Sequence, residues 1–94
     1  MPKRIAQAHV RVPEAPRVRF YQRVTENGAV RLQDVTTRVA MLVLEDLEEN
    51  GSCALLRLDS DGKLVWRSRF PSLREAKWHV EFEYGLPEEK WSPC

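Results

Sequence analysis

The sequence predicts an α+β domain: an antiparallel meander of four to five strands with one C-terminal helix packed on one face. Three observations lead to this fold class. Short segments of alternating or continuous apolar residues recur along the chain. Turn signals, Asn27-Gly28 and Asn50-Gly51 among them, separate these segments. One longer segment near the C-terminus lies between a helix-start signal and a helix-stop signal.

The composition is that of a small globular domain. The chain has 94 residues, of which 43% are hydrophobic and 31% charged. Its net charge of +1 gives no overall attraction to nucleic acid or to a membrane. No apolar run approaches the ~18 residues of a membrane span, and the two isolated cysteines fit a reducing compartment. We therefore expect a cytoplasmic protein with no membrane partner.

Residues 1–16 are interpreted as an N-terminal arm, and residues 17–94 as a single α+β domain. The arm contains Pro2, Pro13 and Pro16 and shows little periodicity. Terminal segments of this kind are often poorly ordered unless another element holds them. We expect the arm to be extended or flexible.

The first predicted strands form a hairpin. Residues 17–24 and 29–33 alternate between apolar and polar side chains on either side of Asn27-Gly28. Residues 38–44 are nearly continuously apolar and too short for a confident helix assignment. They predict a central strand that is buried on both faces.

A second hairpin follows. Residues 52–58 and 63–70 have strand patterns and flank the turn Asp59-Ser60-Asp61-Gly62. The glycine occupies a position that favours a positive φ. This pair completes the predicted sheet.

The helix has signals at both ends. Ser72 is a suitable N-cap, and Glu75 three residues later completes a capping box. Gly85 suits the C′ position, and Pro87 prevents the helix from continuing. We expect a helix between Ser72 and Gly85.

Apolar residues occur on two opposite faces of this helix. Trp78 and Phe82, spaced i and i+4, contact each other on the face turned away from the sheet. With Trp91 they form the candidate partner interface; the alternative is that the N-terminal arm or Trp91 folds over the pair. The opposite stripe, which we expect to lie on the sheet, consists of Leu73, Ala76, Val80 and Tyr84.

Basic residues suggest a second candidate surface. Lys63, Arg67 and Arg69 project from one face of a predicted strand, and Arg57 can join them from the neighbouring strand. Together they are candidate phosphate contacts, because a shared positive face can bind a nucleic-acid backbone. The alternative, a solvated outer sheet face, is favoured by the nearly neutral net charge.

The sequence predicts no catalytic, cofactor-binding or metal-ligating residues. His79 lies between Glu75 and Glu83 on the helix, a pattern more typical of a solvated flank than of a metal site. Asp59 and Asp61 fit a hairpin loop and lack the further ligands of a calcium loop. The glycines form no phosphate-binding loop. We expect a protein that is not an enzyme.

Three motifs carry a resemblance: residues 59–66 (DSDGKLVW) followed by Phe70, residues 72–76 (SLREA), and residues 81–85 (EFEYG). They resemble a group of small uncharacterised bacterial proteins, in which a β-hairpin leads into a helix that ends on an acidic-aromatic-acidic-aromatic-glycine signature. The resemblance implies a bacterial cytosolic origin and supplies no activity. A weaker likeness is to the WGR domain of DNA-responsive enzymes, with Trp66-Arg67-Ser68 near the place of the Trp-Gly-Arg signature.

Two functional hypotheses follow. The first is a non-enzymatic protein-interaction or accessory module that self-associates through Trp78 and Phe82. The alternative is a nucleic-acid-binding module that uses the Arg-rich sheet face. They differ in their response to salt, because only phosphate contacts weaken steeply as the salt concentration rises.

Overall fold

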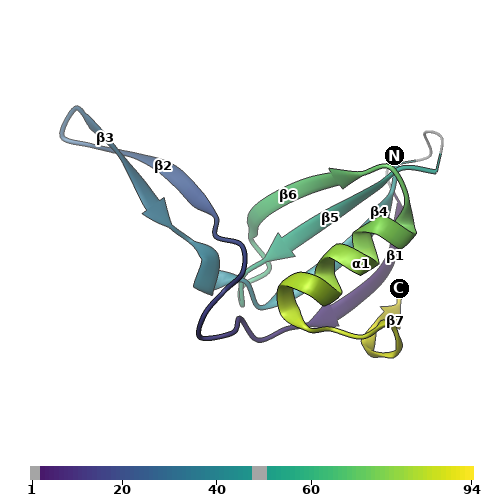
Figure 1. The fold of residues 1–94 in the computed structure, drawn as a ribbon. Coiled ribbons are helices and arrows are strands. Elements are labelled where there is room, and N and C mark those ends of the chain that lie inside the picture. Colours follow the sequence, from purple (N-terminus) through teal and green to yellow (C-terminus); the bar gives the residue numbers. More distant parts are fainter. Residues whose placement is uncertain (1–2, 48–50) are drawn as a thin grey trace.

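A computed structural model describes residues 3–47 and 51–94 and contains two antiparallel sheets and one α-helix (Figure 1). The elements in chain order are β1 (Lys3–His9), β2 (Tyr21–Glu26), β3 (Ala29–Asp34), η1 (Thr36–Arg38), β4 (Met41–Asp46), β5 (Cys53–Leu58), β6 (Leu64–Phe70), α1 (Leu73–Tyr84), η2 (Glu88–Lys90) and β7 (Ser92–Pro93). The larger sheet has the strand order β6-β5-β4-β1-β7, and β2 and β3 form a sheet of their own. The predicted fold class, an antiparallel sheet under a C-terminal helix, is confirmed.

The N-terminal segment contains a strand that was not predicted from the sequence. In β1, Ala6 lies opposite Leu44 of β4 and Ala8 opposite Leu42, while β7 pairs with the other edge of β1. The interpretation of residues 1–16 as an arm is therefore wrong for Lys3–His9, which lies inside the larger sheet. Its buried side chains are small alanines, so the strand's alternation is weak in the sequence.

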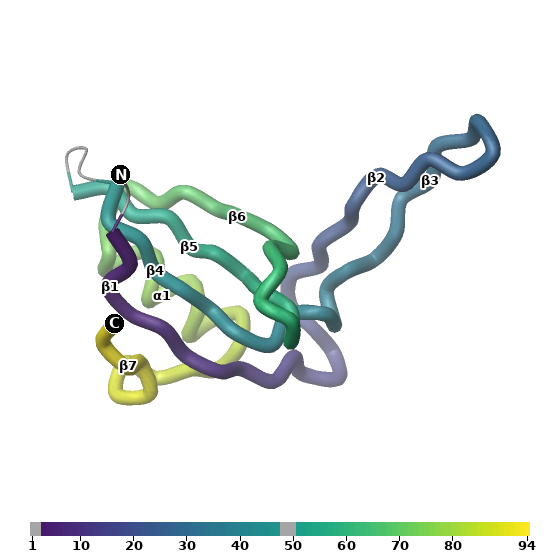
Figure 2. The backbone as a smooth tube through the Cα atoms, turned by 180° about the vertical axis from the view of Figure 1, so that it is seen from behind, coloured from purple at the N-terminus to yellow at the C-terminus, as the bar shows by residue number. Residues whose placement is uncertain are grey.

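The β2–β3 hairpin projects from the body of the molecule (Figures 1 and 2). Its strands pair from Tyr21 opposite Asp34 to Glu26 opposite Ala29, and both turn residues have positive φ, 51° at Asn27 and 79° at Gly28. The hairpin closes at the predicted turn, but its first strand begins at Tyr21 and not at residue 17, and the hairpin stands apart from the meander. Consistent with this projection, the radius of gyration is 14.1 Å, against about 12 Å for a compact domain of this length.

The core lies between α1 and one face of the larger sheet (Figure 1). Ala76 and Val80 are fully buried there, as the helical pattern predicts, and Tyr84 packs against them. Leu73, the first residue of the helix, is 37% exposed, so the buried stripe begins only at Ala76. A second cluster of Val43, Leu56 and Leu58 occupies the opposite sheet face. Because β4 contributes to both clusters, its predicted burial on both faces is confirmed.

Both ends of α1 follow the predicted signals. The Ser72 hydroxyl accepts a hydrogen bond from the Glu75 backbone N–H at 3.2 Å. At the other end, Gly85 adopts φ 67° and its N–H donates to the Glu81 carbonyl at 2.8 Å. These local contacts set the helix length independently of the sheet. No helix in residues 3–47 and 51–94 is long and apolar enough to cross a membrane.

Candidate interaction site on the helix

Two aromatic side chains stand side by side on the outer face of α1. Trp78 is 68% exposed and Phe82 is 45% exposed. Their ring centroids are 6.3 Å apart and their planes differ by only 13°, so the rings are stacked. Each aromatic left in water forgoes the stabilisation of burial, roughly 25 cal/mol per Å² of apolar surface. Aromatic residues on a surface are typical of the centre of a protein–protein interface.

The segment after β1 reaches one flank of this pair. The Arg17 guanidinium carbon lies 4.9 Å from the centroid of the Phe82 ring, within cation–π range. Pro13 and Ala15 line a hollow with Phe82 on the same side. Trp78 nevertheless keeps two-thirds of its surface exposed. The N-terminal arm therefore covers part of Phe82 and leaves Trp78 uncovered by the part of the chain that the structure describes.

Trp91, the third member of the predicted interface, lies elsewhere. It is partly buried against the apolar core under α1, in the turn between η2 and β7. Its indole Nε1 is buried and forms no hydrogen bond with any described residue. Trp91 therefore belongs to the packing of the C-terminus, and the prediction that it shares a surface with Trp78 and Phe82 is wrong.

Charged side chains frame Trp78. Arg74, four residues before it, and Glu81, three residues after it, lie on the same side of the helix. Neither has an ion-pair partner in residues 3–47 and 51–94, whereas Lys77 contacts Glu88 at 3.4 Å. The hollow here has a volume of about 470 Å³ and is lined by Leu73, Arg74, Lys77, Trp78, Glu81 and Glu88.

Arg57 does not lie on the predicted basic face. In the register of β5 and β6 its cross-strand neighbour is Trp66, whereas the neighbour of Arg67 is Leu56. Because side chains alternate along a strand, Arg57 and Arg67 point to opposite faces of the sheet. Arg57 faces the helix and is fully buried, so its predicted role as a phosphate contact is wrong.

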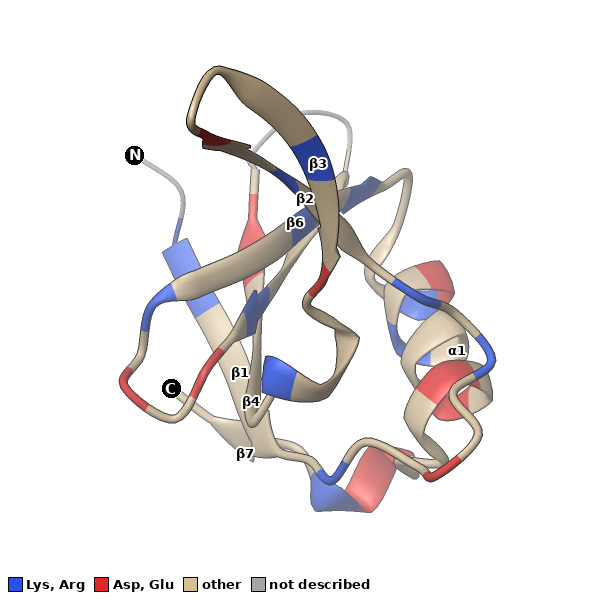
Figure 3. Cartoon of the chain, turned by 90° about the vertical axis from the view of Figure 1, so that its left-hand side faces the viewer, with Lys and Arg blue, Asp and Glu red and all other residues tan. Residues whose placement is uncertain are grey.

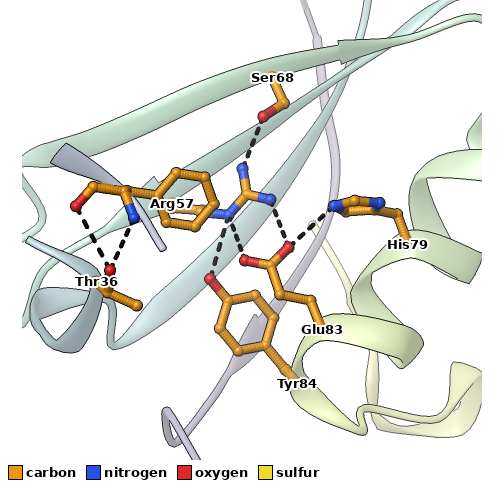
Figure 4. A network of polar contacts seen from close by, with 7 residues as sticks. Thr36, Arg57, Ser68, His79, Glu83 and Tyr84 are labelled. Atoms are coloured by element: carbon orange, nitrogen blue, oxygen red, sulfur yellow. Dashed lines mark hydrogen bonds and ion pairs between the residues drawn. The ribbon is translucent and has the colours of Figure 1, made fainter. Parts of the chain in front are cut away.

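The buried guanidinium of Arg57 is bound on several sides (Figure 4). Glu83 accepts two hydrogen bonds, from Nε at 3.3 Å and from Nη2 at 2.8 Å. Nη1 donates to the Ser68 hydroxyl at 2.9 Å, and Nε also donates to the Tyr84 hydroxyl at 3.2 Å. The guanidinium carbon lies 4.4 Å from the centroid of the Phe20 ring. These contacts hold the guanidinium in one place between the sheet and the helix, so its role is structural.

Two further contacts extend this network. His79 Nε2 lies 3.1 Å from the Glu83 carboxylate, and Glu83 is buried, so the interpretation of this flank of the helix as solvated is wrong at Glu83. On the far side, the Thr36 hydroxyl accepts a hydrogen bond from the Phe20 N–H at 2.8 Å (Figure 4). Glu83 is buried, which was not predicted from the sequence. Its spacing from Ala76 and Val80 follows the i, i+4, i+7 pattern of a buried face, which could have revealed it.

The remaining basic candidates stay on the outer side of the larger sheet. Arg67 and Arg69 lie opposite Leu56 and Ala54 of β5, on the face away from α1. Lys63 is exposed immediately before the same strand. Without Arg57 the predicted patch is reduced to side chains from a single edge strand.

The other reactive side chains that the structure describes do not group into a site. Burial raises the pKa of the Cys53 thiol, which makes it a poor nucleophile, and Cys94 is exposed near the C-terminus. Within residues 3–47 and 51–94 no three His, Cys, Asp or Glu side chains are grouped so as to hold a metal ion.

No protein-family model, curated protein or solved structure matches this chain. The resemblance of its hairpin and helix motifs to small bacterial proteins therefore stays a prediction.

Proposed function

We propose that this chain is a non-enzymatic protein-interaction module that self-associates through the outer face of α1. The observation that carries the proposal is the stacked pair of Trp78 and Phe82, which is exposed although the core beneath the helix is filled. A pair of rigid aromatic side chains supplies a large contact area at a small cost in conformational entropy. The proposal includes a bacterial cytoplasmic setting, supported by the hairpin–helix motifs and by the two unbridged cysteines.

Charge complementarity favours a second copy as the occupant of this face. Two α1 helices can pack antiparallel about a twofold axis that passes midway between Lys77 and Trp78. This arrangement sets Arg74 of each copy opposite Glu81 of the other, and both side chains lack an ion-pair partner within the described residues of their own chain. The same symmetry sets Leu73 opposite Phe82, so that exposed apolar surfaces meet.

The expected dimer is small and reversible. One pair of short helices with a few aromatic contacts falls at the low end of specific interfaces, where association depends on concentration. The ion pairs at its rim fix the antiparallel register and add little affinity, roughly 0.2–1 kcal/mol each. Most of the affinity therefore rests on Trp78.

Light scattering at increasing protein concentration tests the proposal. We expect the mass of the wild-type protein to rise toward that of a dimer, and Trp78→Ala to remain monomeric at the same concentrations. Val30→Ala is the matched control, because Val30 is 60% exposed on the hairpin, away from α1. A wild-type protein that stays monomeric throughout would contradict self-association.

Nucleic-acid binding is the second candidate function. What supports it is that Arg67 and Arg69 share the outer sheet face, with Lys63 immediately before their strand. Binding of this kind loses affinity steeply with salt. A titration of a labelled oligonucleotide at two salt concentrations distinguishes it from the aromatic interface, whose affinity changes little with salt.

A further inference from the structure

The β2–β3 hairpin leaves the body of the protein beside the free edge of β6 (Figures 1 and 2). Among the described strands, β6 pairs only with β5, and β2 pairs only with β3. Each therefore presents a row of backbone N–H and C=O groups without a strand partner. At the base of the hairpin, the Gln22 side chain donates a hydrogen bond to the Val65 carbonyl at 2.9 Å. A side chain thus takes the place of a neighbouring strand at that point of the edge.

A groove lies between these two edges. It has a volume of about 600 Å³ and is lined by consecutive residues of both strands, 21–23 of β2 and 64–67 of β6. Because the lining residues are consecutive, the groove follows the strand direction. Its shape therefore suits an extended chain better than a compact ligand.

The apolar side chains that line the groove are exposed, and one of them is held by a contact with another ring. Tyr21, Leu64 and Trp66 are 46%, 54% and 38% exposed. The Trp66 ring lies against Phe20, with 5.3 Å between the ring centroids. Such contact holds the indole in position before any partner binds, which reduces the entropic cost of binding.

The charged residues that line the groove are all basic. Arg23 and Arg67 border the groove, and no acidic residue lines it. Neither arginine forms an ion pair with a residue in the described ranges, and Figure 3 shows basic positions in blue on both β2 and β6. An occupant that brings carboxylates would be matched to this charge.

The two kinds of lining residue lie on different sides of β6. Trp66 has Arg57 as its cross-strand neighbour and so lies on the helix side, whereas Arg67 has Leu56 and lies on the outer side. A strand added at this edge would alternate in the same way. Its apolar side chains would meet Trp66, and the residues between them would meet Arg67.

We propose that this groove binds an extended segment of a partner protein, with acidic and apolar residues in alternation, which adds as a strand to the edge of β6. Backbone hydrogen bonds to β6 provide the affinity, and the Trp66 and Arg67 sides provide the selectivity. Single-stranded nucleic acid could also stack on the aromatic rings. The free strand edge favours a peptide, because bases and phosphates do not continue the hydrogen-bond ladder of a sheet.

Fluorescence anisotropy with labelled ten-residue peptides tests the proposal. The probe alternates Glu with Val; one comparison peptide replaces Glu by Lys, and another places Pro at central positions to remove backbone donors. We expect the Glu peptide to bind at least about tenfold more tightly than either comparison peptide, a difference of about 1.4 kcal/mol. Equal binding of all three peptides, or binding of none, would overturn the proposal.

Variants of the exposed lining residues complete the test. Arg67→Glu is expected to lower the affinity for the Glu peptide and raise the affinity for the Lys peptide. Trp66→Ala is expected to lower the affinity for both. An oligothymidylate of similar length serves as the nucleic-acid probe, and binding of this probe in place of the Glu peptide would also overturn the proposal. Trp78→Ala is the control that should leave peptide binding unchanged. Arg67→Glu should likewise leave the dimer mass unchanged, so the two proposals can fail separately.

Discussion

Arg57 of β5 and Glu83 of α1 form a buried, bidentate ion pair that joins the sheet to the helix. Their side chains are 1% and 2% exposed, and Nη2 of Arg57 lies 2.8 Å from Oε2 of Glu83. Removing such charges from water is costly, and the Ser68 and Tyr84 hydroxyls offset part of that cost by accepting hydrogen bonds from the guanidinium. The pair favours the packing in which the Glu83 face of the helix lies on the sheet, because a buried carboxylate needs a charged or hydrogen-bonding partner and Arg57 supplies two hydrogen bonds there.

Breaking this pair on one side should destabilise the domain strongly. In Glu83→Ala the guanidinium stays buried without its carboxylate, and we expect a loss of about 3–5 kcal/mol in the free energy of unfolding. The double variant Arg57→Met/Glu83→Leu removes both charges and should recover most of that loss. Urea denaturation measures all three proteins. A double variant that is no more stable than the single one would contradict this account.

Tyr84 should make the fold sensitive to alkaline pH. Burial, followed by the nearby Glu83 carboxylate, raises the pKa of the Tyr84 phenol above its ordinary value of 10.0. The neutral phenol is thus favoured in the folded state, so this stabilisation is complete below the unfolded pKa and is lost as pH rises toward the folded pKa. Absorbance at 295 nm in a Tyr21→Phe background, which leaves Tyr84 as the one tyrosine, should show no phenolate until the protein unfolds.

A Tyr84→Phe variant provides the control. It should lose the hydrogen bond from Arg57, at a cost of about 0.5–1.5 kcal/mol near neutral pH. As the pH rises above 10, the free energy of unfolding of Tyr84→Phe should therefore fall less than that of the Tyr21→Phe protein. Parallel alkaline stability curves for the two proteins would contradict the role assigned to Tyr84.

Asp34 should make the base of the hairpin sensitive to acid. Hydrogen bonds from Thr36, with a smaller contribution from Arg19, lower the pKa of this exposed carboxyl below its ordinary value of 3.8. A depressed pKa stabilises the fold above the unfolded pKa, and that contribution is lost as pH falls through the folded value. In Asp34→Asn, the amide chemical shifts of Val35 and of Thr36, whose N–H donates to the Asp34 carboxylate in the wild-type protein, should stop changing with pH in that acidic range. If those amide shifts still changed with acid as they do in the wild-type protein, Asp34 would not be the group whose titration causes the changes.

Reversal of charge on α1 tests the geometry of the proposed dimer. Arg74→Glu sets carboxylates opposite each other at both symmetry-related positions, which should raise the dimer dissociation constant roughly five- to thirtyfold, or about 1–2 kcal/mol. Adding Glu81→Arg restores opposite charges across the interface and should restore the affinity. Sedimentation equilibrium measures both variants.

The control for this reversal is Lys63→Glu, which changes the net charge equally at an exposed position before β6. It should leave the dimer intact. If the single and double variants at positions 74 and 81 dissociate to the same extent, the antiparallel register is wrong, even where Trp78→Ala still abolishes the dimer.

Local signals account for the elements that were predicted correctly. Ser72 and Gly85 bound α1 through contacts within a few residues, and Asn27-Gly28 closes the hairpin by its backbone preference alone. The exposed Trp78–Phe82 pair also follows from helical spacing, since the two residues lie one turn apart. Each of these features depends on neighbours along the chain, which the sequence displays directly.

The features that were missed depend on residues far apart in sequence. Membership of Lys3–His9 in the sheet is decided by its pairing with β4, and the sequence alone presented that segment as a weakly patterned arm. The side of the sheet that Arg57 faces is decided by strand register, where a shift of one residue reverses every side chain.

The amino-acid sequence by itself determined the helix, its two caps, the hairpin turns and the outer aromatic pair, because these are short-range consequences of backbone preference and periodicity. The tertiary structure alone decided that the β2–β3 hairpin projects beside a free edge of β6, that Arg57 pairs with Glu83, and that Trp91 packs against the core. The physical reason is that burial and pairing between distant segments select one register and one packing from several that satisfy the same local pattern.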